Sequence, residues 1–519
     1  MSKSNEAFHH SISSTETCGE ESQNDISTDV LSIDLRCKSS PESSRCSSPE
    51  YLCEQFTNGP STGALNEISN GLSAAGPVCG SFKYVQELSG ECKHMSSNNE
   101  DNRTAPGHKK RPDCMQVGST DKPDQILPIH QKHNFWGKQP VKQYDDEEKG
   151  VLEEGPIAHL RCVDDVRTEP FKLPEHYEWC TCDLNCSETA DEVYNLLSRH
   201  YVEDYESMFR YHYPKDFLQW ALCPPGYLPD WHVGIRVEAT KRLVAFITGI
   251  PANIRLHDRN LQMAEVNFLC IHRELRSKRL APLLIKEVTR RVHLKNVWQA
   301  VYTAGIMLPT PIATCHYWHR PLNPKKLIRV GFSELGLGMT MNQTIKHYRL
   351  PPNVITPGFR AMERRDVLAV THLLQQYLLQ FLVAPVLSEA DVEHWLVPVS
   401  DVVATYVIED VESGQITDFC SFYTLPSTIL GNHKYKDIKA AYSFYHASTK
   451  TSLVELLNDL LIVAKCHGFD VFNVLDIMHN RSFLQELKFK LGDGELRYYL
   501  YNYRIKETLF PRDIGLLLL

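Results

Sequence analysis

The sequence predicts an α/β (α+β) protein made of two similar halves, in which a mixed β-sheet core is flanked by helices. Three observations predict this fold. Short apolar runs alternate with amphipathic helical patterns, the order strand, loop, strand, helix occurs twice, and both occurrences follow a long polar segment. At 519 residues the chain is longer than one typical hydrophobic core requires, so we expect two packed domains or two halves of one large unit.

The polar segment comes first in the chain. Residues 1–130 are rich in Ser, Asn, Glu, Gly and Pro, and 21 of the first 100 residues are Ser. Apolar periodicity is absent there, so too little surface would be buried to offset the entropy cost of ordering the segment. We therefore predict a disordered polar N-terminal tail over 1–130, an N-terminal half over 131–340 and a C-terminal half over 341–519.

Composition and charge narrow the class of protein. Hydrophobic residues make up 42% of the chain, charged residues 23%, and the formal net charge is -9. These values are typical of a soluble globular protein, and they supply no basic field for nucleic acid. No run approaches the roughly 18 apolar residues of a membrane span, and the first residues lack the layout of a signal peptide. We expect a cytoplasmic protein, at most partly associated with membranes.

The cysteines do not form a regular framework. Seven of the 16 cysteines, from Cys18 to Cys114, lie in the polar tail. We therefore expect reduced thiols rather than disulfides.

The strands and helices follow from apolar patterning after His133. The apolar runs at 244–250, 266–271, 472–475 and 498–501 predict buried strands. The clearest helical pattern has Leu280, Leu284, Val288 and Val292 at intervals of four residues. Such spacing places them on one face, so the pattern predicts a helix packed on a sheet.

An internal echo predicts the second half. The segment FITGIP at 246–251 is followed 16 residues later by Asn267, and FYTLP at 422–426 is followed 17 residues later by Ser443. A helical pattern comes after each, and the second spans 453–464. The two halves differ in the turn before this helix, which is basic in the first half and reads Thr-Lys-Thr at 449–451 in the second. Only the first turn is suited to a polyphosphate.

The basic turn at 276–281 reads Arg-Ser-Lys-Arg-Leu-Ala and joins a predicted strand to the predicted helix. Unpaired amides at a helix start, the positive end of its dipole and flanking Arg and Lys charges can bind a pyrophosphate such as that of CoA. From the spacing alone, a phosphate site and a solvated basic turn both remain open.

This turn resembles the pyrophosphate loop of the GNAT acyltransferases, and longer segments resemble one family within that group. They are HNFWGKQPV at 133–141, YVED at 201–204, EVNFLC at 265–270, RSKRLA at 276–281, YTAG at 302–305, YWHR at 317–320, FYTLPSTI at 422–429 and GFDVFN at 468–473. Together they resemble the N-myristoyltransferase family over roughly 133–519. The resemblance implies two GNAT-like halves related by a pseudo-two-fold axis and transfer of myristoyl from myristoyl-CoA to an N-terminal glycine.

The resemblance also implies which residues bind the acyl donor. Residues of the first segment are expected to line the acyl-CoA site, those of the strand to lie beside the thioester, and those of the basic turn to contact the CoA phosphates. In that order they are Asn134, Phe135, Trp136; Phe268, Leu269, Cys270, Ile271; and Ser277, Arg279, Leu280, Ala281. No prosthetic group and no metal are expected.

The implied chemistry is direct attack of the glycine amine on the thioester, without an acyl-enzyme. The expected oxyanion hole consists of the main-chain NH groups of Phe268 and Leu269, and such donors typically contribute about 3 kcal/mol each. The expected base is the C-terminal carboxylate of Leu519. A free α-carboxylate has a pKa of about 3.5, so burial by the apolar tail or placement beside the ammonium must compensate. Without the resemblance, the same tail would read as a frayed or membrane-touching end.

For the peptide, the resemblance implies a set of mostly aromatic and polar residues suited to an extended chain. They are Tyr201, Asp204, Phe209, Tyr213, Asn267, Thr303, Gly305, Tyr317, His319, Phe332, Ser427, Tyr442, Asp493 and Leu496. Acids such as Asp204, Glu206 and Asp493 fit a preference for basic residues after the glycine. A small substrate residue, usually Ser, is expected near His319.

Two other site chemistries were weighed and rejected. Cys270 and His272 might form a thiol nucleophile and its base, but nothing in the sequence fixes the pair within reach. Cys180, Cys182 and Cys186 might bind zinc, but no second cluster supplies a fourth ligand at ordinary spacing.

Alternative functions are an acyl-CoA or lipid-binding protein without turnover, and an acyltransferase with another chain length or with lysine preference. The expected partners are proteins with an N-terminal Gly, Ser and basic residues downstream being preferred, with at most transient membrane or ribosome association and a monomeric state. Tyr205, Tyr211, Cys223 and His446 depart from the usual residues of the family, which leaves substrate preference open.

Overall fold

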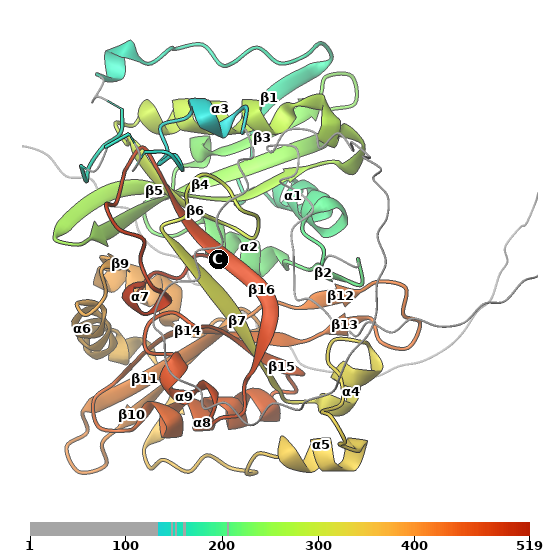
Figure 1. Ribbon diagram of the computed structural model, residues 1–519, viewed down its shortest axis with the longest axis vertical. Helices are drawn as coiled ribbons and strands as arrows, with labels where there is room; N and C mark the ends of the chain where they lie inside the picture. Colours follow the sequence, from blue (N-terminus) through green and yellow to red (C-terminus); the bar gives the residue numbers. More distant parts are fainter. Residues whose placement is uncertain (1–132, 147–148, 151–152, 159–161, 205–206) are drawn as a thin grey trace, which may run out of the picture. The chain divides into compact units, whose positions relative to one another are not determined.

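The computed structural model describes residues 133–146, 149–150, 153–158, 162–204 and 207–519. All of them belong to one contact unit, Ser73–Leu519. The predicted disordered tail over 1–130 lies outside the described residues, as do Tyr205 and Glu206. Within the described part, a 13-stranded mixed sheet runs through both halves and a smaller sheet has three strands (Figure 1).

Among the described residues, the first half contributes seven strands and the second half nine. Those of the first half are β1 (Tyr177–Thr181), β2 (Phe209–Tyr211), β3 (His232–Val237), β4 (Leu243–Leu256), β5 (Arg259–Ile271), β6 (Gln299–Ala304) and β7 (Ala313–Pro321). Those of the second half are β8 (Phe359–Ala361), β9 (Val383–Pro385), β10 (Val403–Glu409), β11 (Ile416–Thr424), β12 (Ser427–Ile429), β13 (Asp437–Ile438), β14 (Ala440–Ser448), β15 (Val471–Leu475) and β16 (Lys490–Tyr501).

Helices cover the large sheet. They are α1 (Ser187–His200), α2 (Lys215–Leu222), α3 (Leu280–His293), α4 (Pro324–Arg329), α5 (Met341–His347), α6 (Val367–Leu378), α7 (Glu389–Leu396), α8 (Leu453–Cys466) and α9 (Arg481–Leu484). Short 3-10 turns are η2 (Trp136–Lys138), η3 (Val163–Asp165), η4 (Pro229–Trp231), η5 (Arg273–Lys278), η6 (Arg364–Asp366) and η7 (Pro511–Asp513).

The predicted elements are present where the patterns put them. The four apolar runs lie in β4, β5, β15 and β16, and the two helical patterns are α3 and α8. In α3, Leu280, Leu284, Val288 and Val292 are all buried. The prediction of a mixed sheet core flanked by helices is confirmed.

The strand order of the large sheet has the same pattern from both edges. It runs β1-β3-β4-β5-β6-β16-β7-β15-β14-β11-β10-β8. In each half, three antiparallel pairs counted from the edge are followed by one parallel pair, β5 with β6 or β14 with β15. One helix joins each parallel pair, α3 or α8, and α1 with α2 or α6 with α7 precede β3 or β10. This order confirms two similar halves with a pseudo-two-fold relation.

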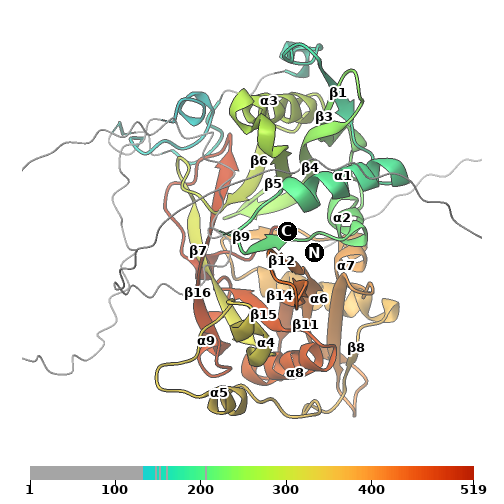
Figure 2. The ribbon, with the colours of Figure 1, turned by 90° about the vertical axis from the view of Figure 1, so that its right-hand side faces the viewer.

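The two halves exchange a strand at the centre of the sheet. β7 follows β6 in the chain but pairs with β15, whereas β16 follows β15 but pairs with β6. β7 and β16 also pair with each other; they cross the middle of the view in Figure 1 and run along the left-hand side of the view in Figure 2. Each half therefore completes the sheet of the other.

The backbone amides in the turns before α3 and α8 differ in their hydrogen-bond partners. Before α8, the amides of Thr449, Lys450 and Thr451 donate to the Asp418 carboxylate over 2.7, 3.0 and 3.1 Å. Ser452 then caps α8 with its side chain. Among the side chains that the structure describes, none caps α3. In the second half, the Asp418 carboxylate thus occupies the place before α8 at which the start of a helix can bind an anion.

Candidate active site

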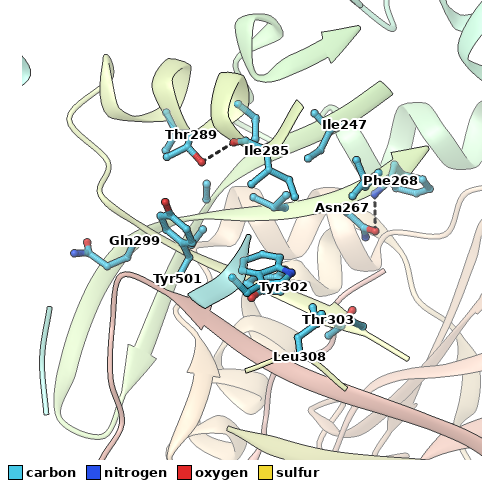
Figure 3. Close-up of a pocket in the computed structure, with 18 of the residues that line it drawn as sticks. Ile247, Asn267, Phe268, Ile285, Thr289, Gln299, Tyr302, Thr303, Leu308 and Tyr501 are labelled. Atoms are coloured by element: carbon cyan, nitrogen blue, oxygen red, sulfur yellow. Dashed lines mark hydrogen bonds between the residues drawn. The ribbon is translucent and has the colours of Figure 1, made fainter. Parts of the chain in front are cut away.

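A cavity of about 1030 Å³, partly open to solvent, lies between β5, β6 and α3. Its position follows from the pairing of the two strands. β5 and β6 are paired only from Met263 to Glu265, and beyond that point they separate. The walls are mainly apolar and come from both strands and from one face of α3, as Figure 3 shows. We call this space the acyl cavity, after the ligand that the family resemblance implies; its mainly apolar lining is typical of a small-molecule site.

Six of the residues expected from the sequence line the acyl cavity. Three come from the set expected for the acyl donor and three from the set expected for the peptide: Trp136, Phe268, Leu269, Tyr201, Asn267 and Thr303. The structure therefore brings parts of both sets to one space.

A β-bulge in β5 forms one wall of the acyl cavity. Thr248 of β4 faces Asn267, but Phe246 faces Cys270, so β5 contains one extra residue between these pairs. Phe268 has a left-handed φ of 54°. Its amide donates to the side-chain Oδ1 of its neighbour Asn267 over 2.8 Å, a bond drawn in Figure 3. The bulge thus removes this amide from the ladder with β4, as bulges beside functional sites commonly do.

The expected CoA-phosphate residues lie in the turn that opens α3. Ser277 belongs to η5, Arg279 is the N-cap residue with φ 57°, and Leu280 and Ala281 form the buried first turn of the helix. Arg276 donates from Nη2 to the carbonyl of His200 over 2.6 Å, which ties the turn to α1.

The field at this turn is positive. The pKa of His200 is lowered to about 4, first by burial and then by the charges of His272, Arg273, Arg242 and Arg276. Burial disfavours a charge of either sign, but the positive charges that add to the shift favour an anion at this turn.

The C-terminal tail is held at the centre of the molecule (Figure 1). The Tyr498 hydroxyl donates to the Leu516 carbonyl over 2.9 Å, and the Leu517 amide donates to the Tyr445 hydroxyl over 3.1 Å. Gly515 lies so close to Phe381 that a Cβ would be 2.6 Å from its ring. The alternative of a frayed end is therefore not what the structure contains.

Leu519 lines a second cavity of about 840 Å³ together with Glu265 of β5. We call this space the tail cavity. Burial raises the pKa of Glu265 to about 7, and a hydrogen bond from the Leu519 backbone partly opposes that rise. Glu265 is a site residue that the sequence reasoning missed, although the segment EVNFLC begins with it. The hydrogen bond from Leu519 joins Glu265 to the far end of the chain, so no local pattern indicates it.

The residues expected for the peptide gather in three aromatic groups. Tyr201 and Tyr213 pack on Phe268 with ring centroids 5.8 and 5.0 Å away. Phe332 packs on Phe209 and on His319, at 5.8 and 5.5 Å.

In the third group, Tyr317 meets Tyr442 edge-on at 6.2 Å. The small sheet adds Ser427, which pairs with Tyr211 between β12 and β2. This sheet joins the two halves beside the aromatic groups.

His319 is fixed in place with one nitrogen unused. Nδ1 lies 2.6 Å from Oδ1 of Asn473, and among the described residues Nε2 has no hydrogen-bond partner. Burial lowers the pKa of His319, so the ring is neutral; because Nδ1–H donates to the Asn473 amide oxygen, Nε2 is left as an acceptor. A Cβ at Gly492 would lie 2.2 Å from this atom, which makes Gly492 a second residue that the sequence reasoning missed.

The two expected acids differ in exposure. Asp204 is buried; Oδ1 accepts from the Phe209 amide over 2.7 Å, and Oδ2 has no partner among the described residues. Asp493 is exposed on β16.

The remaining expected residues lie nearby in the fold. Leu496 is buried opposite Cys315, and the Gly305 carbonyl accepts from Arg497 over 2.6 Å.

Asn134 is exposed, and Phe135 packs edge-on against Trp136 at 5.3 Å. Trp136 in turn stacks on Tyr302 at 5.5 Å. Tyr302 also lines the acyl cavity and was missed although it opens the segment YTAG.

The rejected chemistries find no support in the geometry. Cys270 and Ile271 are buried in two different apolar clusters, and burial strongly raises the pKa of the Cys270 thiol, which makes it a poor nucleophile. The His272 ring contacts His200 and Arg242. In the part of the chain that the structure describes, no three His, Cys, Asp or Glu side chains are grouped as metal ligands. Nor is any described helix long and apolar enough to cross a membrane.

Two sequence profiles of one family match the chain. The profile described as Myristoyl-CoA:protein N-myristoyltransferase, N-terminal domain, covers residues 156–315, and the corresponding C-terminal domain profile covers 329–514. The chain belongs to the N-myristoyltransferase family. The predicted family and enzyme class are confirmed: this N-myristoyltransferase is an acyltransferase. The family description also names myristoyl-CoA, in agreement with the predicted acyl donor.

Curated relatives come from plants, animals and fungi. The chain is 62% identical over 387 residues to glycylpeptide N-tetradecanoyltransferase 1 of Arabidopsis thaliana, covering 75% of this chain and 89% of the relative. It is 51% identical to glycylpeptide N-tetradecanoyltransferase 2 of Danio rerio, covering 75% and 77%. A solved Saccharomyces cerevisiae N-myristoyltransferase with bound myristoyl-CoA is similar with a TM-score of 0.71 at 40% identity, covering 75% of this chain and 94% of that structure.

Proposed function

We propose that this N-myristoyltransferase transfers a myristoyl group from myristoyl-CoA to the N-terminal glycine amine of proteins by direct attack on the thioester. The observation that carries the proposal is the bulge at Phe268, which puts a backbone amide on the wall of an apolar cavity. On the same strand, three residues away, Glu265 contacts the C-terminal residue. A cavity for an acyl chain, an amide for an oxyanion and a carboxylate therefore meet along β5.

The acyl donor would lie with its chain in the acyl cavity and its phosphates at the turn before α3. The uncapped start of α3, the left-handed Arg279 and the surrounding cations support phosphate binding there. The contrast with α8 supports the same assignment, because Asp418 already occupies the equivalent turn of the second half. Asn134, Phe135 and Trp136 would flank the donor from η2.

The oxyanion of the tetrahedral intermediate would accept from the amides of Phe268 and Leu269. The Phe268 amide bonds only the side chain of Asn267 among the described residues, a partner that can turn away without breaking the sheet. Loss of one such donor typically costs about 3 kcal/mol of transition-state stabilisation. The thiolate of CoA leaves as the oxyanion collapses to the amide.

The C-terminal carboxylate of Leu519 would remove a proton from the glycine ammonium. Glu265 lies beside it and is ionised only above about pH 7, because burial raises its pKa. Once ionised, Glu265 adds a negative charge that favours a proton on the neighbouring carboxylate. The activity is therefore expected to rise as the pH passes through this value.

The peptide would run past the three aromatic groups. His319 supports binding of a small hydroxyl residue, since Nε2 is buried without a partner among the described residues. The exposed Asp493 on β16 suits a basic substrate residue. Ser427 and Tyr211, which pair across the small sheet, would flank the same path.

The proposal is tested by measuring free CoA thiol from myristoyl-CoA with a Gly-x-x-x-Ser-Lys peptide and with the same peptide carrying Ala first. We expect release only with the glycine peptide. Tight binding of myristoyl-CoA without release would favour an acyl-CoA-binding protein instead, and release with a lysine side chain as acceptor would indicate a lysine preference.

The base is tested by changing the C-terminus alone. Deleting Leu519 is expected to lower kcat by at least tenfold while leaving myristoyl-CoA binding unchanged, because the carboxylate moves back by one residue of about 3.3 Å. Leu519→Ala is the matched control, since it keeps the carboxylate in place and removes only the side chain. Equal turnover of the deletion and the wild type would remove the carboxylate from the mechanism.

A further inference from the structure

Two thiols lie side by side at the edge of the large sheet. Cys180 lies in β1 and Cys182 directly follows its last residue, Thr181; with one residue between them in extended chain, the two side chains point to the same face. Their sulfur atoms are 3.9 Å apart. Gly234 of β3 faces Cys180, and a Cβ there would lie only 2.6 and 2.7 Å from the two sulfurs. The space for the two thiols thus depends on a glycine on the neighbouring strand β3.

The two thiols differ in reactivity. Cys180 is half-buried, whereas Cys182 is fully buried. A hydrogen bond from Cys182 and the nearby Arg236 guanidinium lower the pKa of the Cys180 thiol. The pKa of Cys182 is raised, by its bond to Cys180 and by burial. This combination of an accessible, activated thiol with a buried neighbour is the arrangement of an attacking and a resolving cysteine.

We propose that Cys180 and Cys182 form a redox-active dithiol, which hydroperoxides convert reversibly into a Cys180–Cys182 disulfide. The Cys180 thiolate attacks one oxygen of hydrogen peroxide, the O–O bond breaks, and a sulfenic acid and hydroxide form. The Cys182 sulfur then attacks the Cys180 sulfur, the S–O bond breaks, and water leaves with the Cys182 proton. In total, two thiols lose two electrons and two protons, and the peroxide is reduced to two waters.

The backbone allows this bridge at the limit of its reach. Residues two apart on a strand are separated by about 6.6 Å, and disulfides span Cα distances of roughly 4.4 to 6.8 Å. Closing the bond must therefore shorten β1 slightly. β1 is an edge strand that pairs only with β3 in the large sheet, so it can bend without displacing a second neighbour. A bridge under such strain is readily reduced again.

A bend in β1 would be transmitted to α1, which lies over the pair. Cys182 packs in the same apolar cluster as Val193 and Leu196 of α1. Arg236, the cation beside Cys180, also holds Glu192 of α1 in an ion pair. α1 ends at His200, directly before Tyr201, which lines the acyl cavity. Oxidation is therefore expected to lower the transfer activity by several fold, and a reductant is expected to restore it.

The test uses the full-length protein, hydrogen peroxide and mass spectrometry. After treatment, free thiols are alkylated and the chain is cleaved on the N-terminal side of Asp183, which separates Cys182 from the exposed Cys186. We expect the fragment ending at Cys182 to lack two hydrogen masses and both alkyl groups, and to regain them after dithiothreitol. Alkylation of both cysteines after peroxide treatment, or a bridge from Cys180 to any other cysteine, would overturn the proposal.

Two variants separate the roles of the thiols. Cys182→Ser should leave Cys180 as a sulfenic acid that dimedone captures, whereas Cys186→Ser is the matched control and should form the disulfide as the wild type does. Transfer activity is measured on the same samples with the glycine peptide. A disulfide that forms in full while activity stays unchanged would overturn the coupling to α1.

Discussion

Replacing His446 by Asn is expected to make the fold much less sensitive to acid. His446 is buried on β14, with Nε2 3.2 Å from the Tyr377 hydroxyl and Nδ1 without a partner among the described residues. Burial, and then the nearby His479, lower its pKa from 6.5 to about 4. Above pH 6.5 the ring is neutral in both the folded and the unfolded chain, so its titration does not change the free energy of unfolding. Below that value the unfolded chain binds a proton that the folded chain excludes until about pH 4, so stability falls over this window.

The size of the effect follows from the two pKa values. At pH 5 the difference between 6.5 and about 4 corresponds to a loss of about 2 kcal/mol relative to pH 7, and the full loss well below pH 4 is about 3 kcal/mol. The assay is the free energy of unfolding in urea at pH 7 and at pH 5. His232, whose pKa burial also lowers to about 4, remains in both proteins and contributes a shared decline.

The comparison is therefore between the decline in the free energy of unfolding from pH 7 to pH 5 in the wild type and the same decline in His446→Asn. The wild type should lose about 2 kcal/mol more than His446→Asn between pH 7 and pH 5. Since the hydroxyl of the adjacent Tyr445 holds the tail through Leu517, turnover of the wild type should also fall in the same window. Equal declines for the two proteins would refute the assignment of a buried neutral ring.

Three further changes have defined outcomes. Glu265→Gln should remove the inflection near pH 7 from the pH profile of kcat/KM and leave myristoyl-CoA binding unchanged, because the group that ionises there is absent; an unchanged inflection would contradict this. Gly492→Ala should raise the KM for a Ser-containing peptide about tenfold or more, since its Cβ displaces the His319 ring, with little effect on a peptide lacking that Ser. Asp418→Asn should lower the free energy of unfolding by about 1 to 3 kcal/mol, because it weakens the hydrogen bonds to the turn before α8. The KM for myristoyl-CoA should not change, because Asp418 and these partners all lie in the second half; a raised KM would contradict the separate roles of the two turns.

The sequence predicted the elements whose pattern is local. α3 and α8 carry apolar residues at helical spacing, and β4, β5, β15 and β16 contain short apolar runs, so each element was recognisable without knowledge of its neighbours. The repeat of strand, loop, strand, helix was also local and was confirmed by the strand order.

The features that the sequence did not predict depend on distant packing. The exchange of β7 and β16 is a choice of partner, and no periodicity within either strand encodes it. Glu265 reads as an ordinary acid until the tail covers it, and Gly492 reads as a turn glycine until His319 is beside it. The resemblance to a family named six of the residues that line the acyl cavity, since it carries information on packing that composition and spacing lack.

The exchanged strands also set an order for folding during synthesis. A chain that has been made as far as β7 has every strand that the first half contributes to the large sheet, yet the position beside β6 is still empty because β16 is formed by residues 490–501. Until that strand arrives, β6 presents unpaired backbone groups of the kind that invite association with other chains. A chain that ends before residue 490 is therefore expected to associate with other chains more readily than the finished protein.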